Sequence, residues 1–229
     1  MDSAMSIAIA AFTIIAFATI LILISGKKSS HSKSNLKQKN RATIIRECTK
    51  KLAHNPHNVQ ALKPLAELYY SEHLWDKALP LYDTLSNIAS RHPEIEIGET
   101  NLKQGICLVK LGKAQEATQK LIIALKSNPT SYEANLFLGK SLFKLNNFEK
   151  AIPLLKKALS LNPEASGVYQ PLGLACYKAH MFKEAIQYLR RALDENPEDK
   201  EALYTLADSM QECGFGDKAL KIFSHLRPD

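Results

Sequence analysis

The sequence has few of the features that mark a catalytic or metal-binding chain. Its four cysteines (Cys48, Cys107, Cys176 and Cys213) are widely separated and form no CxxC pair. Zinc sites usually need closely spaced ligands, so this spacing predicts structural thiols and no metal site. The sequence also lacks a glycine-rich phosphate loop, a GxSxG motif and an HExxH motif. We therefore expect no cofactor, no metal and no enzymatic activity.

Acidic residues are missing from residues 24–41, although this stretch holds six lysines and arginines. Residues 26–51 carry nine basic residues and one acidic residue, whereas residues 52–229 carry 21 of each kind. The formal net charge of +7 is thus concentrated in one short segment. Nucleic-acid-binding domains present a basic face of their own. The neutral balance over residues 52–229 therefore predicts no nucleic-acid partner.

Charged residues are also missing between Ala4 and Ile24, a stretch that is apolar apart from Ser6, Thr13 and Thr19. At about 1.5 Å per residue, a helix over this stretch is roughly 30 Å long, which matches the hydrocarbon core of a bilayer. A cleaved signal peptide is the alternative, but it needs a basic start, a shorter apolar run and a cleavage site of small residues. The pattern favours an uncleaved transmembrane helix within residues 1–25.

The basic residues after this run predict its orientation. Lysines and arginines next to a membrane span favour the cytoplasmic side. We therefore expect a single-pass protein with its N-terminus outside and its remaining residues in the cytoplasm, at a bacterial inner membrane rather than an organelle membrane. Residues 26–41 are predicted to be a flexible basic linker, which could also contact anionic lipid. An inverted topology, with the rest of the chain outside the cytoplasm, is the alternative.

Small residues and prolines recur at one constant interval along the rest of the chain. The recurring positions are Gly105, Gly139 and Gly173, Ala117, Ala151, Ala185 and Ala219, and Pro129, Pro163 and Pro197. Within each unit, apolar residues at helical spacing predict two antiparallel helices that can bury their faces only by stacking on the next unit. We expect five units in residues 58–229, starting near residues 59, 98, 132, 166 and 200, and a capping helix within residues 42–57.

The unit at residues 166–197 resembles the tetratricopeptide repeat family. The matching residues are Tyr169, Leu172, Gly173, Cys176, Ala185, Leu189, Ala192 and Pro197. The resemblance implies an all-α solenoid of helix–turn–helix repeats, here preceded by a single transmembrane helix. It also implies that the first helix of each repeat lines a groove that binds a protein or peptide partner.

The family's groove positions can be carried over to this chain. They correspond to Lys63, Tyr70, Lys110, Lys140, Phe143, Lys144, Tyr177, Lys178, Tyr204 and Asp208. Lys110, Lys144 and Lys178 recur at the interval of the repeat and could form a ladder for an acidic or carboxylate-bearing peptide. The alternative is that these lysines are ordinary solvated residues.

These features predict a membrane-anchored scaffold or adaptor that binds a protein or peptide partner at the cytoplasmic membrane face. The alternative is the non-catalytic, anchoring part of a longer enzyme or regulator. The sequence stops inside the second helix of the fifth repeat, where no later element would cover the apolar residues Leu220, Ile222, Phe223 and Leu226. This predicts either a longer chain, or packing of the last repeat on a partner, or self-association of two copies through the last repeat.

Overall fold

A computed structural model describes residues 40–226, with side chains described up to residue 222. The predicted transmembrane helix within residues 1–25 and most of the predicted linker lie outside the described residues. Among residues 40–226, no helix is long and apolar enough to cross a bilayer. Residues 40–54 are helical, so the helix here overlaps the end of the predicted linker.

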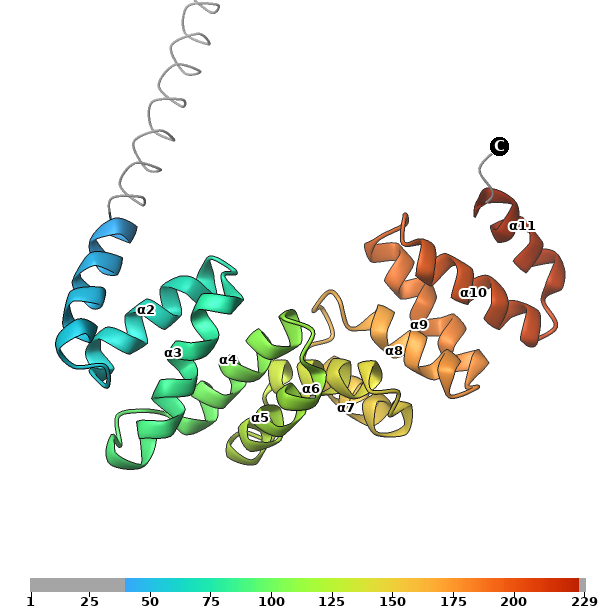
Figure 1. The fold of residues 1–229 in the computed structure, drawn as a ribbon. Helices are drawn as coiled ribbons and strands as arrows, with labels where there is room; N and C mark the ends of the chain where they lie inside the picture. Colours follow the sequence, from blue (N-terminus) through green and yellow to red (C-terminus); the bar gives the residue numbers. More distant parts are fainter. Residues whose placement is uncertain (1–39, 227–229) are drawn as a thin grey trace, which may run out of the picture. The chain divides into compact units, whose positions relative to one another are not determined.

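The described chain is all-α and contains no β-strand between residues 40 and 226, so the predicted fold class of an all-α solenoid is confirmed (Figure 1). After the helical residues 40–54, the elements are α2 (Val59–Ser71), α3 (Trp75–Ile88), the short 3₁₀ helix η1 (Ala89–Arg91), α4 (Ile97–Lys110), α5 (Ala114–Ser127), α6 (Tyr132–Lys144), α7 (Phe148–Leu161), α8 (Tyr169–Lys178), α9 (Phe182–Glu195), α10 (Lys200–Glu212) and α11 (Gly216–Leu226). Residues up to Pro64 belong to one compact unit and residues from Leu65 onward to a second.

The second helix of each repeat buries a stripe of apolar residues. In α7 the buried residues include Ala151, Leu155 and Ala158, whose spacing of four and then three positions places them on one helix face. The equivalent residues of α5 and α9 are Ala117, Leu121, Ala124, Ala185, Leu189 and Ala192, and all of them are buried. The regular spacing of the alanines therefore reflects one repeated packing face.

Glycine in the first helix allows the two helices of a repeat to approach closely. A Cβ atom placed on Gly139 would lie 2.7 Å from Cγ of Leu155, and one placed on Gly173 would lie 2.7 Å from Cγ of Leu189. Gly105 faces Leu121 in the same way, at 2.6 Å. These distances are shorter than van der Waals contact, so a larger residue would push the paired helices apart.

The turn inside each repeat has a left-handed residue. His73, Asn146 and His180 have φ between 57° and 59°, and the equivalent Gly112 and Gly214 have φ of 76° and 82°. The N–H of the following residue then bonds back to the first helix; in the fourth repeat, for example, Met181 donates to the Cys176 carbonyl at 2.8 Å. This is the Schellman pattern of helix termination.

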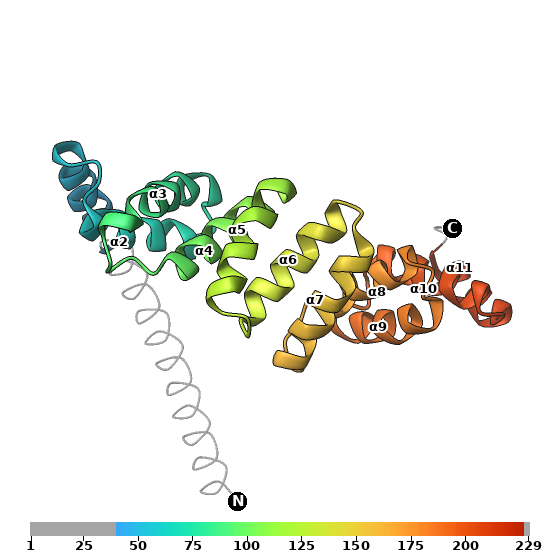
Figure 2. The same ribbon diagram turned by 90° about the horizontal axis from the view of Figure 1, so that it is seen from below.

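In the unit from Leu65 onward, the helices from α3 to α11 follow one another in chain order (Figure 2). The first helices α4, α6, α8 and α10 contact one another in sequence, as well as packing on the second helices of their own and neighbouring repeats. They therefore share one side of the stack. At the last repeat, the side chain of Leu220 is 67% exposed, and self-association through this repeat stays a prediction.

Candidate partner-binding groove

A groove of about 700 Å³ opens along the first helices of the second, third and fourth repeats. It is lined by Val109, Gly112, Lys113, Ala114, Gln115, Glu116, Lys140, Ser141, Phe143, Lys144, Leu145, Gln170, Pro171, Leu174 and Glu201. Most of its lining is apolar, and its volume is in the range of sites that hold a ligand. The structure therefore places three predicted groove residues, Lys140, Phe143 and Lys144, around one cavity.

Lys140 is the most buried lysine of this groove. Its side chain is half-buried in α6, and its Nζ lies 5.7 Å from the centre of the Phe137 ring, while the Nζ of Lys110 lies 5.8 Å from the same ring. Burial, and then the charge of Lys110, lower the pKa of Lys140, and the charge of Glu195 opposes them. No carboxylate among the described side chains forms an ion pair with Lys110 or Lys140.

Lys103, earlier in α4, differs from Lys110 and Lys140 because it forms ion pairs with two glutamates. Its Nζ lies 2.6 Å from Glu67 Oε1 and 2.9 Å from Glu99 Oε1. The hydroxyl of the buried Tyr82 also donates to Glu67, at 3.0 Å. The protein itself pairs this cation with two carboxylates, so Lys103 adds little to the basic character that Lys140 and Lys144 give the groove.

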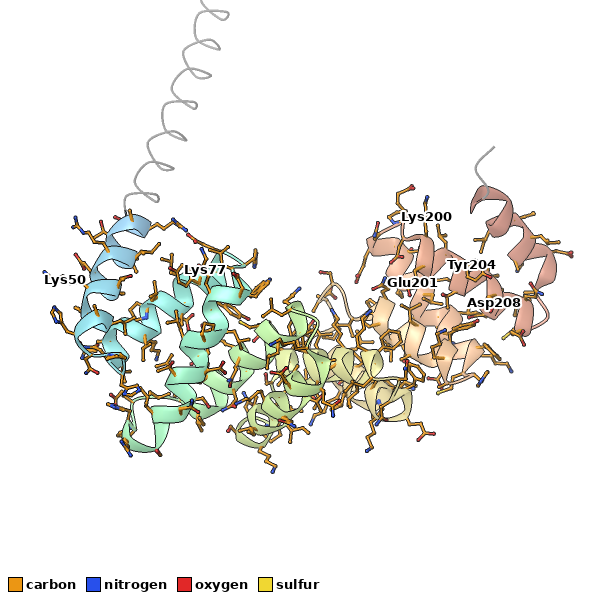
Figure 3. The ribbon with its side chains drawn as sticks, viewed as in Figure 1. Lys50, Lys77, Lys200, Glu201, Tyr204 and Asp208 are labelled. Atoms are coloured by element: carbon orange, nitrogen blue, oxygen red, sulfur yellow. The ribbon has the colours of Figure 1, made fainter. Side chains whose placement is uncertain are left out.

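Two predicted groove residues of the last repeats bind each other. The hydroxyl of Tyr177 in α8 donates to Asp208 Oδ2 in α10 at 2.5 Å, and this hydrogen bond raises the pKa of Tyr177 to about 12. Figure 3 shows Glu201, Tyr204 and Asp208 along α10, where their spacing of three and four positions places them on one face. The groove lining is thus acidic at α10, through Glu201, and basic at α6, through Lys140 and Lys144, rather than basic along its whole length.

The other predicted residues have less specific surroundings. Tyr70 is half-buried in contact with Trp75, and its burial raises its pKa. Lys178 lies over the ring of Tyr177 at 5.5 Å, and Tyr204 is 59% exposed. Lys63 is exposed and belongs to the unit that ends at Pro64. That these residues bind a partner stays a prediction.

The ladder lysines Lys110, Lys144 and Lys178 are all exposed, and each is the last residue of its helix. A cation at this place also interacts favourably with the C-terminal end of the helix dipole. Their regular spacing therefore has a structural explanation that is independent of a ligand. It does not exclude a binding role, because an exposed ammonium can serve both purposes.

Sequence reasoning missed the contribution of the turn between α4 and α5. Gly112, Lys113 and Ala114 line the groove, together with Leu145 from the next turn. The family pattern directs attention to the first helices, whereas these residues lie at or beyond the helix ends. The signal was present in the sequence, because residues 109 and 114 of the second repeat differ in size from their equivalents in the third and fourth repeats.

Within the described residues, nothing resembles a metal or nucleophile site. No cluster of three His, Cys, Asp or Glu residues between residues 40 and 226 could hold a metal ion. Cys48, Cys107 and Cys176 are buried, and burial raises the pKa of Cys107 to about 12 and that of Cys176 to about 11. Thiols in this state are poor nucleophiles at neutral pH.

Comparison with known proteins identifies the repeat. Two family models, each described as a tetratricopeptide repeat, match residues 102–166 and residues 176–229, and together they span about half of the chain. The chain therefore contains tetratricopeptide repeats, as the resemblance predicted. No curated protein sequence matches it.

Solved structures of other proteins share the fold. YrrB, described as a TPR protein with an unusual peptide-binding site, is 21% identical, with a TM-score of 0.62 over 77% of this chain and 89% of its own. A MamA structure from AMB-1 is 23% identical, with a TM-score of 0.62 over 74% and 96% of the two chains. MamA from Desulfovibrio magneticus RS-1 is 22% identical, with a TM-score of 0.61 over 72% and 91%. At these identities the likeness establishes the fold.

Proposed function

We propose that this tetratricopeptide repeat protein is a membrane-anchored scaffold whose groove binds an acidic segment of a protein partner. One observation carries the proposal: Lys140 lines a largely apolar groove, Lys110 lies near the same Phe137 ring, and neither lysine forms an ion pair with a carboxylate among the described side chains. Desolvating an unpaired cation costs free energy that an incoming carboxylate would recover. The described peptide-binding site of YrrB, a protein of the same fold, is consistent with such a role.

Binding of a protein partner by the groove is tested by affinity capture from detergent-solubilised native membranes, followed by mass spectrometry of the captured proteins. A Lys110→Glu, Lys144→Glu variant reverses two exposed charges at the groove. A Lys157→Glu, Lys183→Glu variant makes the same net change on the exposed faces of the second helices α7 and α9. We expect the groove variant to recover at least about tenfold less partner than the control variant, since charge reversal replaces attraction by repulsion. Equal recovery by both variants would refute the groove assignment.

The proposal also places the repeats on the cytoplasmic side of a membrane, held by the apolar residues 4–24. Cys213 offers a direct test because its side chain is partly exposed, whereas Cys48, Cys107 and Cys176 are buried. A membrane-impermeant maleimide applied to intact cells should leave Cys213 unlabelled until the membrane is permeabilised. Labelling in intact cells would place the repeats outside the cytoplasm. Recovery of the chain in the soluble fraction would contradict the anchor.

A further inference from the structure

An aromatic pair closes the turn in three of the five repeats. Its first member is the last residue but one of the first helix, and its second member is the first residue of the second helix. The pairs are Tyr70 with Trp75, Phe143 with Phe148, and Tyr177 with Phe182, and their ring centres lie 5.3, 5.6 and 6.0 Å apart. These rings fill the space between the two helices where they diverge at the turn.

The second repeat lacks this pair. Its equivalent residues are Val109 and Ala114, and the turn between them contains Gly112. All three residues line the groove of about 700 Å³. The space that two aromatic rings occupy in the neighbouring repeats is therefore part of the open cavity, and the next first helix, α6, contributes Lys140 to the same lining.

We propose that this gap in the second repeat is a pocket for one bulky apolar side chain of an acidic partner peptide, whose flanking carboxylates pair with Lys140 and Lys110. The inference rests on the proposed groove function and extends it to a specific anchor position. The open apolar surface of Val109 and Ala114 provides the contact for the side chain, in place of the missing rings.

The charges around the pocket support an acidic occupant. Lys140 lines the pocket, and Lys110 lies near the same Phe137 ring as Lys140. Neither lysine has an ion-pair partner among the described side chains, although the charge of Glu195 acts on Lys140. The acid at the start of α5, Glu116, forms an exposed ion pair with Lys113, at 3.8 Å. The remaining acid of the lining, Glu201, comes from α10. A bound peptide should therefore direct its carboxylates towards α4 and α6 and away from α10.

The probes are fluorescein-labelled dodecapeptides of Gly and Ser. One set has a central Phe between Asp and Glu residues, the second has a central Ala between the same acids, and the third has a central Phe between Lys residues. Binding to the full-length chain is measured by fluorescence anisotropy. Burying a large apolar side chain is expected to favour the Phe-centred acidic set over the Ala-centred set by about 10- to 100-fold.

The pocket is then filled by restoring the aromatic residue. In Ala114→Phe the new ring occupies the gap, whereas the control Gly216→Phe introduces the same ring at the equivalent turn of the fifth repeat, where an added Cβ meets no atom within 4 Å. Should Ala114→Phe fail to fold, Val109→Tyr restores the other member of the pair. We expect the filling variant to lose the preference for Phe over Ala, and the control to retain it.

The outcomes separate this inference from the proposed function. Equal binding of the Phe-centred and Ala-centred acidic peptides, with binding still lost on Lys110→Glu, Lys144→Glu substitution, would overturn the pocket and leave the acidic groove standing. Tighter binding of the Lys-flanked set, or no binding of any peptide, would also overturn the pocket. Concentration-dependent self-association in analytical ultracentrifugation that Ala114→Phe abolishes would assign the pocket to a second copy of the chain instead of a peptide.

Discussion

Replacement of Gly173 by alanine should destabilise the protein even though alanine is the better helix former. The added Cβ would lie 2.7 Å from Cγ of Leu189, 2.9 Å from its Cδ2 and 3.1 Å from its backbone nitrogen. A side-chain rotation can relieve the first two contacts but not the third, so α8 and α9 must separate. Overpacking of this kind costs about 1–3 kcal/mol, whereas the gain in helix propensity is about 1 kcal/mol. The midpoints of these two ranges leave an expected net loss of stability of about 1 kcal/mol.

Urea unfolding followed by circular dichroism measures this change. Gly216→Ala is the matched control, because the Cβ added there meets nothing within 4 Å, and it should leave stability unchanged or raise it slightly. Leu189→Ala alone should cost about 2–5 kcal/mol, since Leu189 is fully buried. In the Leu189→Ala background, the cost of Gly173→Ala should shrink because the clashing γ and δ carbons are absent. A Gly173→Ala variant as stable as the wild type would refute the close-packing argument.

Three further predictions concern the turns, the thiols and a hydrogen bond between repeats. Gly214→Ala should lower the free energy of unfolding by about 1 kcal/mol, because φ is 82° at this residue. Gly214→Asn should lower it less, because Asn146 adopts the same left-handed conformation at the equivalent turn. Equal thermal midpoints for both variants and the wild type would contradict this prediction. In the native protein Ellman's reagent should react with Cys213 alone, and in guanidinium chloride with all four thiols; fast reaction of a second native thiol would refute the burial. The hydrogen bond to Asp208 raises the pKa of Tyr177 to about 12, whereas tyrosine in an unfolded chain has a pKa near 10. The hydrogen bond therefore contributes its full stability below about pH 10, and this contribution is lost as the pH rises to about 12. Tyr177→Phe should remove this loss from the pH dependence of the urea midpoint.

Most of the fold could be predicted from the sequence because equivalent residues make the same packing contacts in each repeat. The alanines of the second helices and the glycines of the first helices recur at one interval, and the structure places them in equivalent contacts. The paired helices follow from this periodicity, whereas the placement of the groove on the first helices is what the resemblance to tetratricopeptide repeat proteins implied.

The groove itself could be predicted only in part, because its shape and charge depend on where one repeat departs from the others. Val109 and Ala114 open space that the family pattern would fill, and a single repeat examined alone does not show this. The pairing of Tyr177 with Asp208 was also hidden, because it joins two repeats that each look ordinary. Periodicity indicates which residues share a helix face, but it does not indicate which of them form hydrogen bonds or ion pairs with each other.

The most direct test of the account is site-specific photo-cross-linking in native membranes. A photoreactive phenylalanine analogue at position 143 would lie in the groove, and the same analogue in place of the exposed Lys157 would lie on the second helix α7. The account predicts that position 143 captures a defined protein partner, that position 157 does not, and that Lys110→Glu, Lys144→Glu substitution abolishes the capture. Capture from position 157 but not from position 143 would contradict a binding groove on the first helices.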